Sequence, residues 1–261
     1  MDERLISIAR GLRQGIKWAI NPFDWAVREI NNKKSQPPLW LRQKVGSLND
    51  FEGSGAEYMA YLKLLCGLTP GMSVLDIGCG CGLLCLDNTE NGSILKYLGY
   101  GRGRYVGVDI DSTAISWCKR NIEPKYPTAR FYNGIENVPT SYRFNLVVCK
   151  SLFTHLLAFE LESTLDFIKI FLAKGGKILT TWFIIENNEV STLEGRYTFS
   201  YPGVDCWYER GTNPQLAVAY DLNFLKDLFK KFEFGYDIWY GGWRGSNRGL
   251  SYQDIIILKG E

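Results

Sequence analysis

Apolar and amphipathic stretches alternate along the chain, and this alternation predicts strands and helices in turn. Short apolar runs bounded by turn residues predict strands at 74–77, 105–108, 129–132, 144–149 and 177–185. Helical spacing of apolar residues predicts helices at 57–68, 112–121, 158–172 and 222–231. Strands that alternate with helices indicate an α/β fold built on a parallel sheet.

Local signals set several boundaries of these elements. Asp111 or Ser112 is suited to cap the helix that follows it. The Gly175-Gly176 pair is expected to end the helix that precedes it. Two further strands, joined by a glycine-rich turn, are predicted at 232–240 and 252–258.

The first twenty residues follow a different pattern. Apolar residues recur there at helical spacing, and most basic residues lie elsewhere on the helical wheel. The pattern predicts an amphipathic basic helix, which suits a membrane surface, a targeting signal or a cap packed on its own domain. Acidic residues at positions 2 and 3 count against targeting, and we favour a cap. The apolar positions are Leu5, Ile8, Leu12 and Ile16.

A linker is predicted after this helix. Residues 31–38 are polar and end in two prolines, which is typical of a connection between two parts of a chain. We therefore expect an N-terminal helical arm at 1–50, able to move, and a main domain at 51–261.

Candidate chemistry begins at residues 74–82, which read V-L-D-I-G-C-G-C-G. An apolar run ends there in Asp76 and opens into a glycine loop, whose bare backbone lets a cofactor approach closely. About thirty residues further on, a second apolar run ends in Asp109, and a carboxylate at such a strand end suits a ribose diol. Together the two motifs predict a nucleoside site.

The glycine spacing separates two kinds of nucleoside cofactor. The dinucleotide pattern G-x-G-x-x-G requires a glycine at position 83, where this chain has Leu83. An NAD(P)-dependent oxidoreductase is therefore the runner-up.

These motifs resemble those of class I S-adenosylmethionine-dependent methyltransferases, whose first motif reads V-L-D-x-G-C-G-x-G. The resemblance continues through the strand at 144–149 and the S-L-F-T-H-L loop at 151–156, and it covers roughly residues 60–258. The stretches at 242–245 and 251–254 are similar to a bacterial small-molecule subgroup. The resemblance implies a Rossmann-like mixed seven-stranded sheet with helices on both faces. It also implies a C-terminal antiparallel hairpin whose final strand is inserted into the sheet.

The resemblance also implies a role for individual residues. Asp76 would lie near the methionyl amino group, Asp109 would accept both ribose hydroxyls, and Ile110 would pack on the adenine. Glu136 or Asn137 would receive the adenine amino group, although either also suits a turn. Without a cofactor, the strand-end acids would simply cap helices. The expected cofactor-binding set is Asp76, Gly78, Cys79, Gly80, Asp109, Ile110, Glu136, Lys150 and Ser151.

Two residues are candidates for removing a proton from the acceptor. His155, the only histidine, follows the strand at 144–149 near the end where open α/β sheets bind ligands. Glu186 follows the strand at 177–185 and would orient His155 or act alone. The alternatives are a histidine bonded to backbone and a solvated glutamate.

The segment after Glu186 is rich in aromatic residues, and we expect it to close an acceptor pocket, or else to form a satellite hydrophobic cluster. Trp243, Arg244 and Arg248 would help to close the same rim. The residues that carry this expectation are Tyr197, Phe199, Tyr201, Trp207, Tyr208 and Arg210.

The favoured function is O-methylation of a small molecule such as a natural product, peptide, polyketide or sugar. The N-P-P-Y or D-P-P-Y signature of DNA-base methylation is absent, because Cys149-Lys150-Ser151-Leu152 occupies its place. A non-catalytic protein that binds S-adenosylmethionine is a further alternative.

Composition limits the partners and the cellular compartment that we expect. The net charge of +2 and the absence of a long basic run give no reason to expect a nucleic-acid partner. No apolar stretch reaches the roughly twenty residues of a membrane span. Seven cysteines without a signal peptide predict free thiols in the cytoplasm, and the ligand spacing of a metal site is missing around Cys79, Cys81 and Cys85. Self-association is left open.

Overall fold

The fold is described from a computed structural model, which covers residues 21–31, 33–45, 51–86, 93–186, 196–245 and 249–260. The basic helix predicted within the first twenty residues and the predicted rim residue Arg248 both lie outside these residues. A helix occupies 21–30, and the other helices are α2 (Leu39–Arg42), α3 (Phe51–Leu64), α4 (Ile94–Gly99), α5 (Ser112–Asn121), α6 (Ala158–Phe171) and α7 (Leu222–Lys231).

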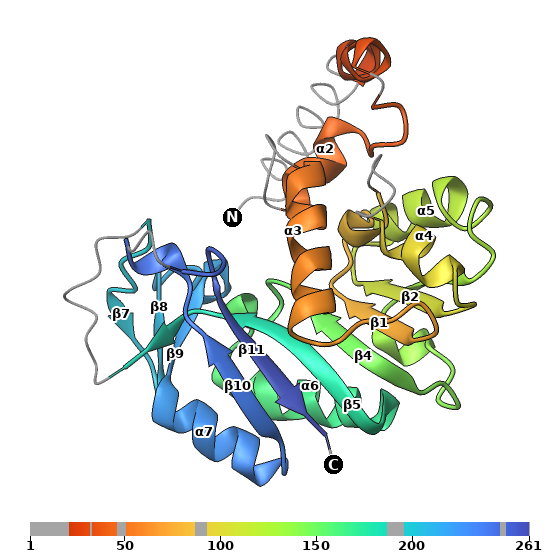
Figure 1. Ribbon diagram of the computed structural model, residues 1–261. Helices are drawn as coiled ribbons and strands as arrows, with labels where there is room; N and C mark the ends of the chain where they lie inside the picture. The colour runs from red at the N-terminus through yellow and green to blue at the C-terminus, as the bar shows by residue number, and fades with distance from the viewer. Residues whose placement is uncertain are drawn as a thin grey trace.

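A seven-stranded mixed sheet forms the centre of the molecule (Figure 1). Its strand order is β10-β11-β5-β4-β1-β2-β3, parallel from β3 to β5 and antiparallel at β11 and β10. The predicted insertion of the last strand into the sheet is confirmed, because β11 lies between β5 and β10. The strands are β1 (Ser73–Ile77), β2 (Arg104–Asp109), β3 (Ala129–Asn133), β4 (Phe144–Cys149), β5 (Leu172–Trp182), β10 (Gly235–Trp239) and β11 (Asp254–Lys259).

Helices cover both faces of this sheet, as predicted. Successive residues of a strand point to opposite faces, so Val74 of β1 belongs to the core cluster that includes α3, α4 and α5, and Leu75 belongs to the cluster that includes α6 and α7. Every residue from Ile255 to Leu258 of β11 is buried for the same reason. A strand covered on both faces reads as a continuous apolar run, which is why the sequence pattern was informative.

The start of β5 departs from the prediction. α6 ends at Phe171 and β5 begins at the next residue, so the glycine pair at 175–176 does not end the helix. The pairing with β4 shifts register there, and Gly175 has a φ of 67°. The glycines therefore allow a bulge inside a strand.

A second, four-stranded sheet was not predicted. Its order is β6-β9-β8-β7, and it lies beyond the end of β5. It consists of β6 (Ile184–Ile185), β9 (Val218–Asp221), β8 (Cys206–Tyr208) and β7 (Tyr201–Pro202).

Residues 33–45, which include most of the linker predicted at 31–38, make specific contacts with their neighbours. The buried Asp24 carboxylate accepts hydrogen bonds from Arg28 at 2.9 Å and from Arg42 at 2.6 Å. Arg28 also donates to the carbonyl of the buried Gln36. Leu41 is buried against the glycine loop. Ion pairs and hydrogen bonds hold this segment in place. Such contacts leave no apolar pattern in the sequence, so its packing could not be predicted.

No helix in the described ranges has the length and apolar character needed to cross a membrane.

Candidate functional site

Charged residues from three neighbouring parallel strands meet at one edge of the main sheet. Asp76 lies near the end of β1, Asp109 ends β2, and Lys150 directly follows β4. The carboxyl ends of parallel strands share an edge, and this edge is where open α/β sheets bind ligands. The structure therefore places two acids and one lysine of the expected cofactor-binding set at the same edge.

The glycine loop crosses the end of β2, and Gly78 is its exposed residue. The N–H groups of Gly78 and Cys79 both donate to the carbonyl of Val108, at 2.8 and 3.0 Å. Gly78 and Gly82 both have a φ of 81°, a conformation that favours glycine. A Cβ placed on Gly78 would meet no atom within 4 Å, so open space lies beside it, whereas one on Gly82 would lie 2.8 Å from the Cδ1 of Ile122.

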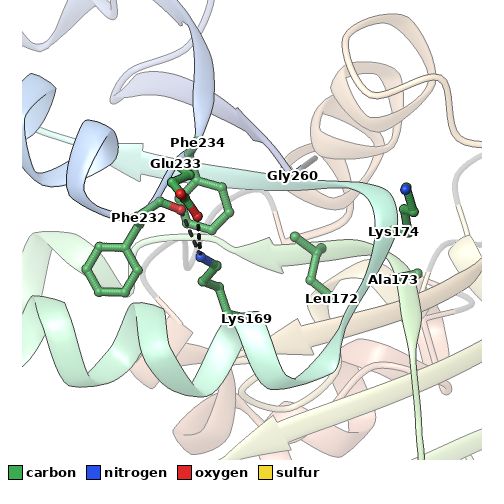
Figure 2. Close-up of a pocket in the computed structure, with 8 residues that line it drawn as sticks. All are labelled: Lys169, Leu172, Ala173, Lys174, Phe232, Glu233, Phe234 and Gly260. Carbon is green, nitrogen blue, oxygen red and sulfur yellow. Dashed lines mark hydrogen bonds and ion pairs between the residues drawn. The ribbon is translucent and has the colours of Figure 1, made fainter.

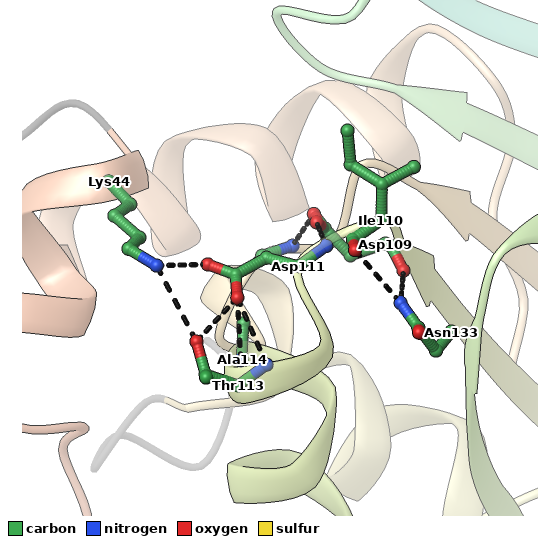
Figure 3. Close-up of polar contacts among 8 residues, drawn as sticks. Lys44, Asp109, Ile110, Asp111, Thr113, Ala114 and Asn133 are labelled. Carbon is green, nitrogen blue, oxygen red and sulfur yellow. Dashed lines mark hydrogen bonds and ion pairs between the residues drawn. The ribbon is translucent and has the colours of Figure 1, made fainter. Parts of the chain in front are cut away.

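Asp109 connects the glycine loop to the turn after β2 (Figure 3). Its Oδ2 accepts a hydrogen bond from the N–H of Gly80, and its Oδ1 accepts one from the N–H of Asp111, both at 2.8 Å. Each carboxylate oxygen keeps further acceptor capacity, which matches the two hydroxyls of a vicinal diol. The neighbouring Ile110 is 92% exposed, so its apolar side chain is available to a flat ligand.

Asn133, at the end of β3, holds the same turn in place. Its Nδ2 donates to the carbonyls of Asp109 and Ile110, at 2.9 and 3.0 Å. The sequence reading missed this residue, although its position at the end of the strand next to β2 was a usable signal.

Glu136 and Asn137 lie in a short turn after β3. Asn137 donates to the carbonyl of Asn133 at 2.6 Å and to Glu136 at 3.2 Å. A Cβ on Gly134, whose φ is 86°, would overlap the Glu136 carboxylate. The contacts of both candidates therefore stay within their own turn.

Asp76 is the most buried charged group at this edge, with 3% of its surface exposed. It accepts a hydrogen bond from the Tyr105 hydroxyl at 2.6 Å. Burial raises the pKa of Asp76 to about 7, and the negative charge of Asp109 adds to this, although Tyr105 and Lys150 oppose it. A carboxyl group with this pKa gains a proton easily unless a cation is bound beside it.

Lys150 lies close to the same acid. Burial lowers the pKa of its ammonium, and the negative charges of Asp76 and Glu57 act in the opposite direction. The ammonium also lies 5.0 Å from the ring centroid of Tyr58 on α3. A buried acid and a half-buried ammonium at the same edge suit a ligand that carries both an amino and a carboxylate group.

Ser151 has a left-handed backbone conformation, with a φ of 55°. Two bonds hold this strained position: its N–H donates to Thr181 at 2.7 Å, and its hydroxyl donates to Gln253 at 3.0 Å. Strain of this kind, fixed by neighbouring elements, is concentrated at functional sites. Gln253 was named in the sequence reading only as part of the C-terminal motif, and the structure joins it to this site.

His155 and Glu186 are not brought together. His155 is exposed, and its Nδ1 lies 3.0 Å from the carbonyl oxygen of Gln215. Glu186 accepts a hydrogen bond from the Tyr240 hydroxyl. Burial, together with the bond to Glu186, raises the pKa of Tyr240 to about 12. The idea that Glu186 orients His155 therefore has no support in their contacts.

The aromatic segment after Glu186 is partly internal, in contrast to the expected lid. Phe199 is fully buried, with its ring centroid 5.2 Å from that of Phe183 and 5.4 Å from that of Trp243. Trp243 is also buried and donates to Asp254 at 2.7 Å, so it does not line a rim. Within the described residues, this group is the satellite cluster that the sequence left as the alternative.

A cavity of about 170 Å³ lies at the opposite edge of the main sheet (Figure 2). Its one central cation, Lys169, donates to the carbonyl of Phe232 at 3.0 Å and lies 3.8 Å from the Glu233 carboxylate. The candidate site residues are absent from its wall, which consists of Lys169, Leu172, Ala173, Lys174, Phe232, Glu233, Phe234 and Gly260.

The described part of the chain holds no group of three or more His, Cys, Asp or Glu side chains arranged for a metal ion. All seven cysteines are buried as free thiols.

Comparison with known proteins gives a family match and several solved structures of similar fold. A family model described as a methyltransferase domain matches residues 68–199, which is 132 of the 261 residues. A provisionally assigned O-methyltransferase of Nostoc punctiforme has a TM-score of 0.57 and 17% identity, covering 84% of this chain and 59% of its own. The Burkholderia thailandensis 1,6-didemethyltoxoflavin-N1-methyltransferase, solved with 1,6-didemethyltoxoflavin and S-adenosylhomocysteine, has a TM-score of 0.52 and 15% identity, covering 84% and 83%.

A third structure, PKMT2 from Rickettsia typhi with bound AdoHcy, has a TM-score of 0.38 and 21% identity, covering 45% of this chain. The chain thus spans less than two thirds of two of these proteins: 22% of PKMT2 and 59% of the Nostoc protein. At these identities the likeness concerns the fold.

Proposed function

We propose, on the premise that the chain belongs to the methyltransferase domain family, that it is an enzyme that methylates a hydroxyl group of a small molecule. Its cofactor is S-adenosylmethionine, the cofactor of class I methyltransferases. The motifs at the ends of β1 and β2 are suited to bind it. The observation that carries the proposal is the position of the Asp109 carboxylate. It accepts hydrogen bonds from the N–H groups of Gly80 and Asp111, and each of its oxygens can still accept one from a diol hydroxyl.

The residues fit the cofactor on three counts. Gly78 has open space beside its backbone, Asp109 has unused acceptor capacity, and the acid and ammonium of Asp76 and Lys150 complement an amino acid end. We assign the binding set to Asp76, Gly78, Cys79, Gly80, Asp109, Ile110, Glu136, Lys150 and Ser151.

The cofactor supplies an electrophilic methyl group when it is bound. The protein's main task is then to orient the acceptor, and good orientation contributes on the order of 7–11 kcal/mol to such reactions. A general base adds about 10²–10⁴-fold. Loss of the base should therefore slow the reaction without abolishing it.

His155 is our candidate for the base. The carbonyl of Gln215 can only accept a hydrogen bond, so the neutral ring carries its hydrogen on Nδ1 and leaves Nε2 as an acceptor. Nε2 would take the proton from the acceptor hydroxyl. Glu186 is the second candidate and would act on its own, because its partner is Tyr240.

An oxygen acceptor is supported by the loop after β4, where Cys149-Lys150-Ser151-Leu152 replaces the signature of amino-group methylation on DNA bases. The Nostoc relative, provisionally an O-methyltransferase, agrees with this choice. The Burkholderia relative is an N1-methyltransferase, so a nitrogen acceptor is the rival that an experiment must separate.

We also propose that residues 1–50 form an arm over the cofactor side of the domain. Leu41 packs on Cys81 and Leu83 of the glycine loop segment, and Lys44 pairs with Asp111, two residues from Asp109.

The test has two stages. Calorimetry with S-adenosylmethionine, S-adenosylhomocysteine and NAD should show binding of the first two only. Incubation with methyl-deuterated S-adenosylmethionine and matched hydroxyl and amine acceptors, read by mass spectrometry, should then label the hydroxyl compounds. Binding of NAD alone would overturn the reaction class, and labelling of amines alone would overturn the oxygen acceptor.

A further inference from the structure

The helix at 21–30 turns its charged residues toward the protein and its apolar residues toward solvent. Asp24 and Arg28, four residues apart, form the inner side and pair with each other. Phe23, Val27 and Ile30 follow the spacing of a single helical face, and 72% of Phe23 and 82% of Ile30 is exposed. A surface helix of a globular protein normally shows the reverse arrangement. An apolar helix face left in water needs a partner.

The position of the helix leaves this face accessible. Figure 1 shows it at one end of the molecule, beyond α2 and away from the main sheet. Asp24 fixes its orientation, because the carboxylate binds Arg28 and Arg42 and also accepts the N–H of Leu39 at 3.1 Å. The inner side is therefore held to α2 by the Asp24–Arg42 ion pair and the Leu39 hydrogen bond, and the outer side cannot turn inward without breaking them.

Charge is distributed unevenly between this region and the rest of the chain. Residues 1–45 contain nine basic and four acidic residues, whereas residues 46–261 contain 21 basic and 24 acidic residues. The two acids of the helix itself are already paired, Asp24 with arginines and Glu29 with Lys34 at 2.6 Å. The region that carries the exposed apolar face is thus a positive part of a chain that is otherwise slightly negative.

We propose that the helix at 21–30 docks on an anionic lipid surface, lying in the plane of the interface with its outer side among the headgroups. Aromatic and aliphatic side chains next to basic residues are the composition that binds such surfaces. A second copy of the chain fits less well, because it would bring two positive regions together. The outer side consists of Phe23, Val27 and Ile30.

The proposal goes beyond methyl transfer and is tested without any cofactor. The full chain is floated with vesicles of phosphatidylcholine alone and with vesicles in which about one third is phosphatidylglycerol. We expect binding to the second kind, weakened by added salt because the attraction is partly ionic. Absence of binding to the anionic vesicles would overturn the proposal.

Two variants locate the binding surface. Phe23→Ser combined with Ile30→Ser should weaken vesicle binding about tenfold or more, because it removes most of the apolar area that would enter the interface. The matched control is Phe159→Ser on α6, where 76% of the phenylalanine is exposed, and it should bind like the parent. All three side chains are exposed, so we expect the thermal midpoints to stay close together.

Other results would contradict the assignment. Equal vesicle binding by the parent and the double variant would mean that the helix is not the docking element, and equal losses in the double variant and the control would mean the same. A parent dimer that ignores vesicles and becomes monomeric in the double variant, measured by sedimentation velocity, would identify an interface between copies instead.

Discussion

Lys44 and Asp111 join the N-terminal arm to the start of α5, two residues beyond the carboxylate of Asp109 (Figure 3). Asp111 also caps α5, accepting from the N–H groups of Thr113 and Ala114. Burial alone would raise the pKa of Asp111, yet hydrogen bonds from Lys44 and Thr113 lower it to about 2. The ion pair therefore persists at neutral pH, on the side of the domain where we place the cofactor.

Lys44→Met should loosen the arm with little effect on stability. The pair is partly exposed, and such pairs contribute less than about 1 kcal/mol. We expect faster dissociation of S-adenosylmethionine, measured by stopped-flow displacement, with the difference shrinking at high salt. Lys34→Met breaks another pair, with Glu29, and serves as the control. Equal dissociation rates in the two variants would count against the arm as a cover.

Asp109→Ala should weaken S-adenosylmethionine binding at least about 100-fold, because two hydrogen bonds to a charged group are lost. Calorimetry measures the affinity. The control is Asp237→Ala, which removes a partly exposed acid of β10 that pairs with Lys259 of β11. Unchanged affinity would remove Asp109 from the ribose site.

The raised pKa of Asp76 predicts that the affinity for S-adenosylmethionine depends on pH. Its pKa, raised to about 7, means that the carboxylate needed to bind an ammonium is only partly formed at pH 6. Affinity for S-adenosylmethionine should rise about eightfold between pH 6 and pH 7.5, below the range in which the ligand's amino group loses its proton. Asp76→Asn should bind more weakly and without this slope. A parent with no slope would contradict the assignment.

The same raised pKa has a stability consequence. The folded chain holds a proton on Asp76 that the unfolded chain has already lost above pH 3.8. Asp76 should therefore lower the free energy of unfolding increasingly as pH rises from about 4 to about 7, and no further beyond that. Thermal melts of the parent and Asp76→Asn across this window measure the difference.

Gly78→Ala and Gly82→Ala should separate binding from folding. Each forces alanine into a left-handed conformation, at about 1–2 kcal/mol. Gly82→Ala also overlaps Ile122, so it should cost about 1–3 kcal/mol more in urea unfolding. Gly78→Ala meets no protein atom, and its main effect should be weaker cofactor binding. The reverse order would show that the open side of the loop is not the ligand side.

His155→Ala should keep cofactor affinity and lower kcat by about 10²–10⁴-fold if it is the base. Glu186→Gln tests the second candidate. The two side chains have separate partners, so their effects on activation free energy should add within about 0.5 kcal/mol. Undiminished turnover in His155→Ala would retire it from this role.

Much of the main sheet could be predicted because its strands are buried on both faces and its helices have local start signals. The bounds of α5 and α7 were predicted to the residue, and Asp111 and Asp221 cap them. The second sheet could not be predicted, since β6 and β7 have two residues each and depend on distant partners. Trp243 and Phe199 read as rim aromatics because nothing local shows that Asp254 and Phe183 bury them.

The candidate site also contains residues that could be predicted from the sequence and residues that could not. Asp76 and Asp109 are fixed by the strands that carry them, so their proximity follows from a parallel sheet. Three other site residues form hydrogen bonds to distant parts of the chain: Asn133, Gln253 and Thr181. Such bonds do not depend on the spacing of apolar residues, so the sequence pattern did not predict them.

The place of β11 constrains how the protein is made. Because this strand lies between β5 and β10, the sheet cannot be completed until residues 254–259 have left the ribosome. Until then the edge of β5 has no strand to pair with, and an unpaired edge is a template for wrong pairing. The nascent chain must therefore wait for its final strand with most of its core already synthesised, which favours protection by chaperones during translation.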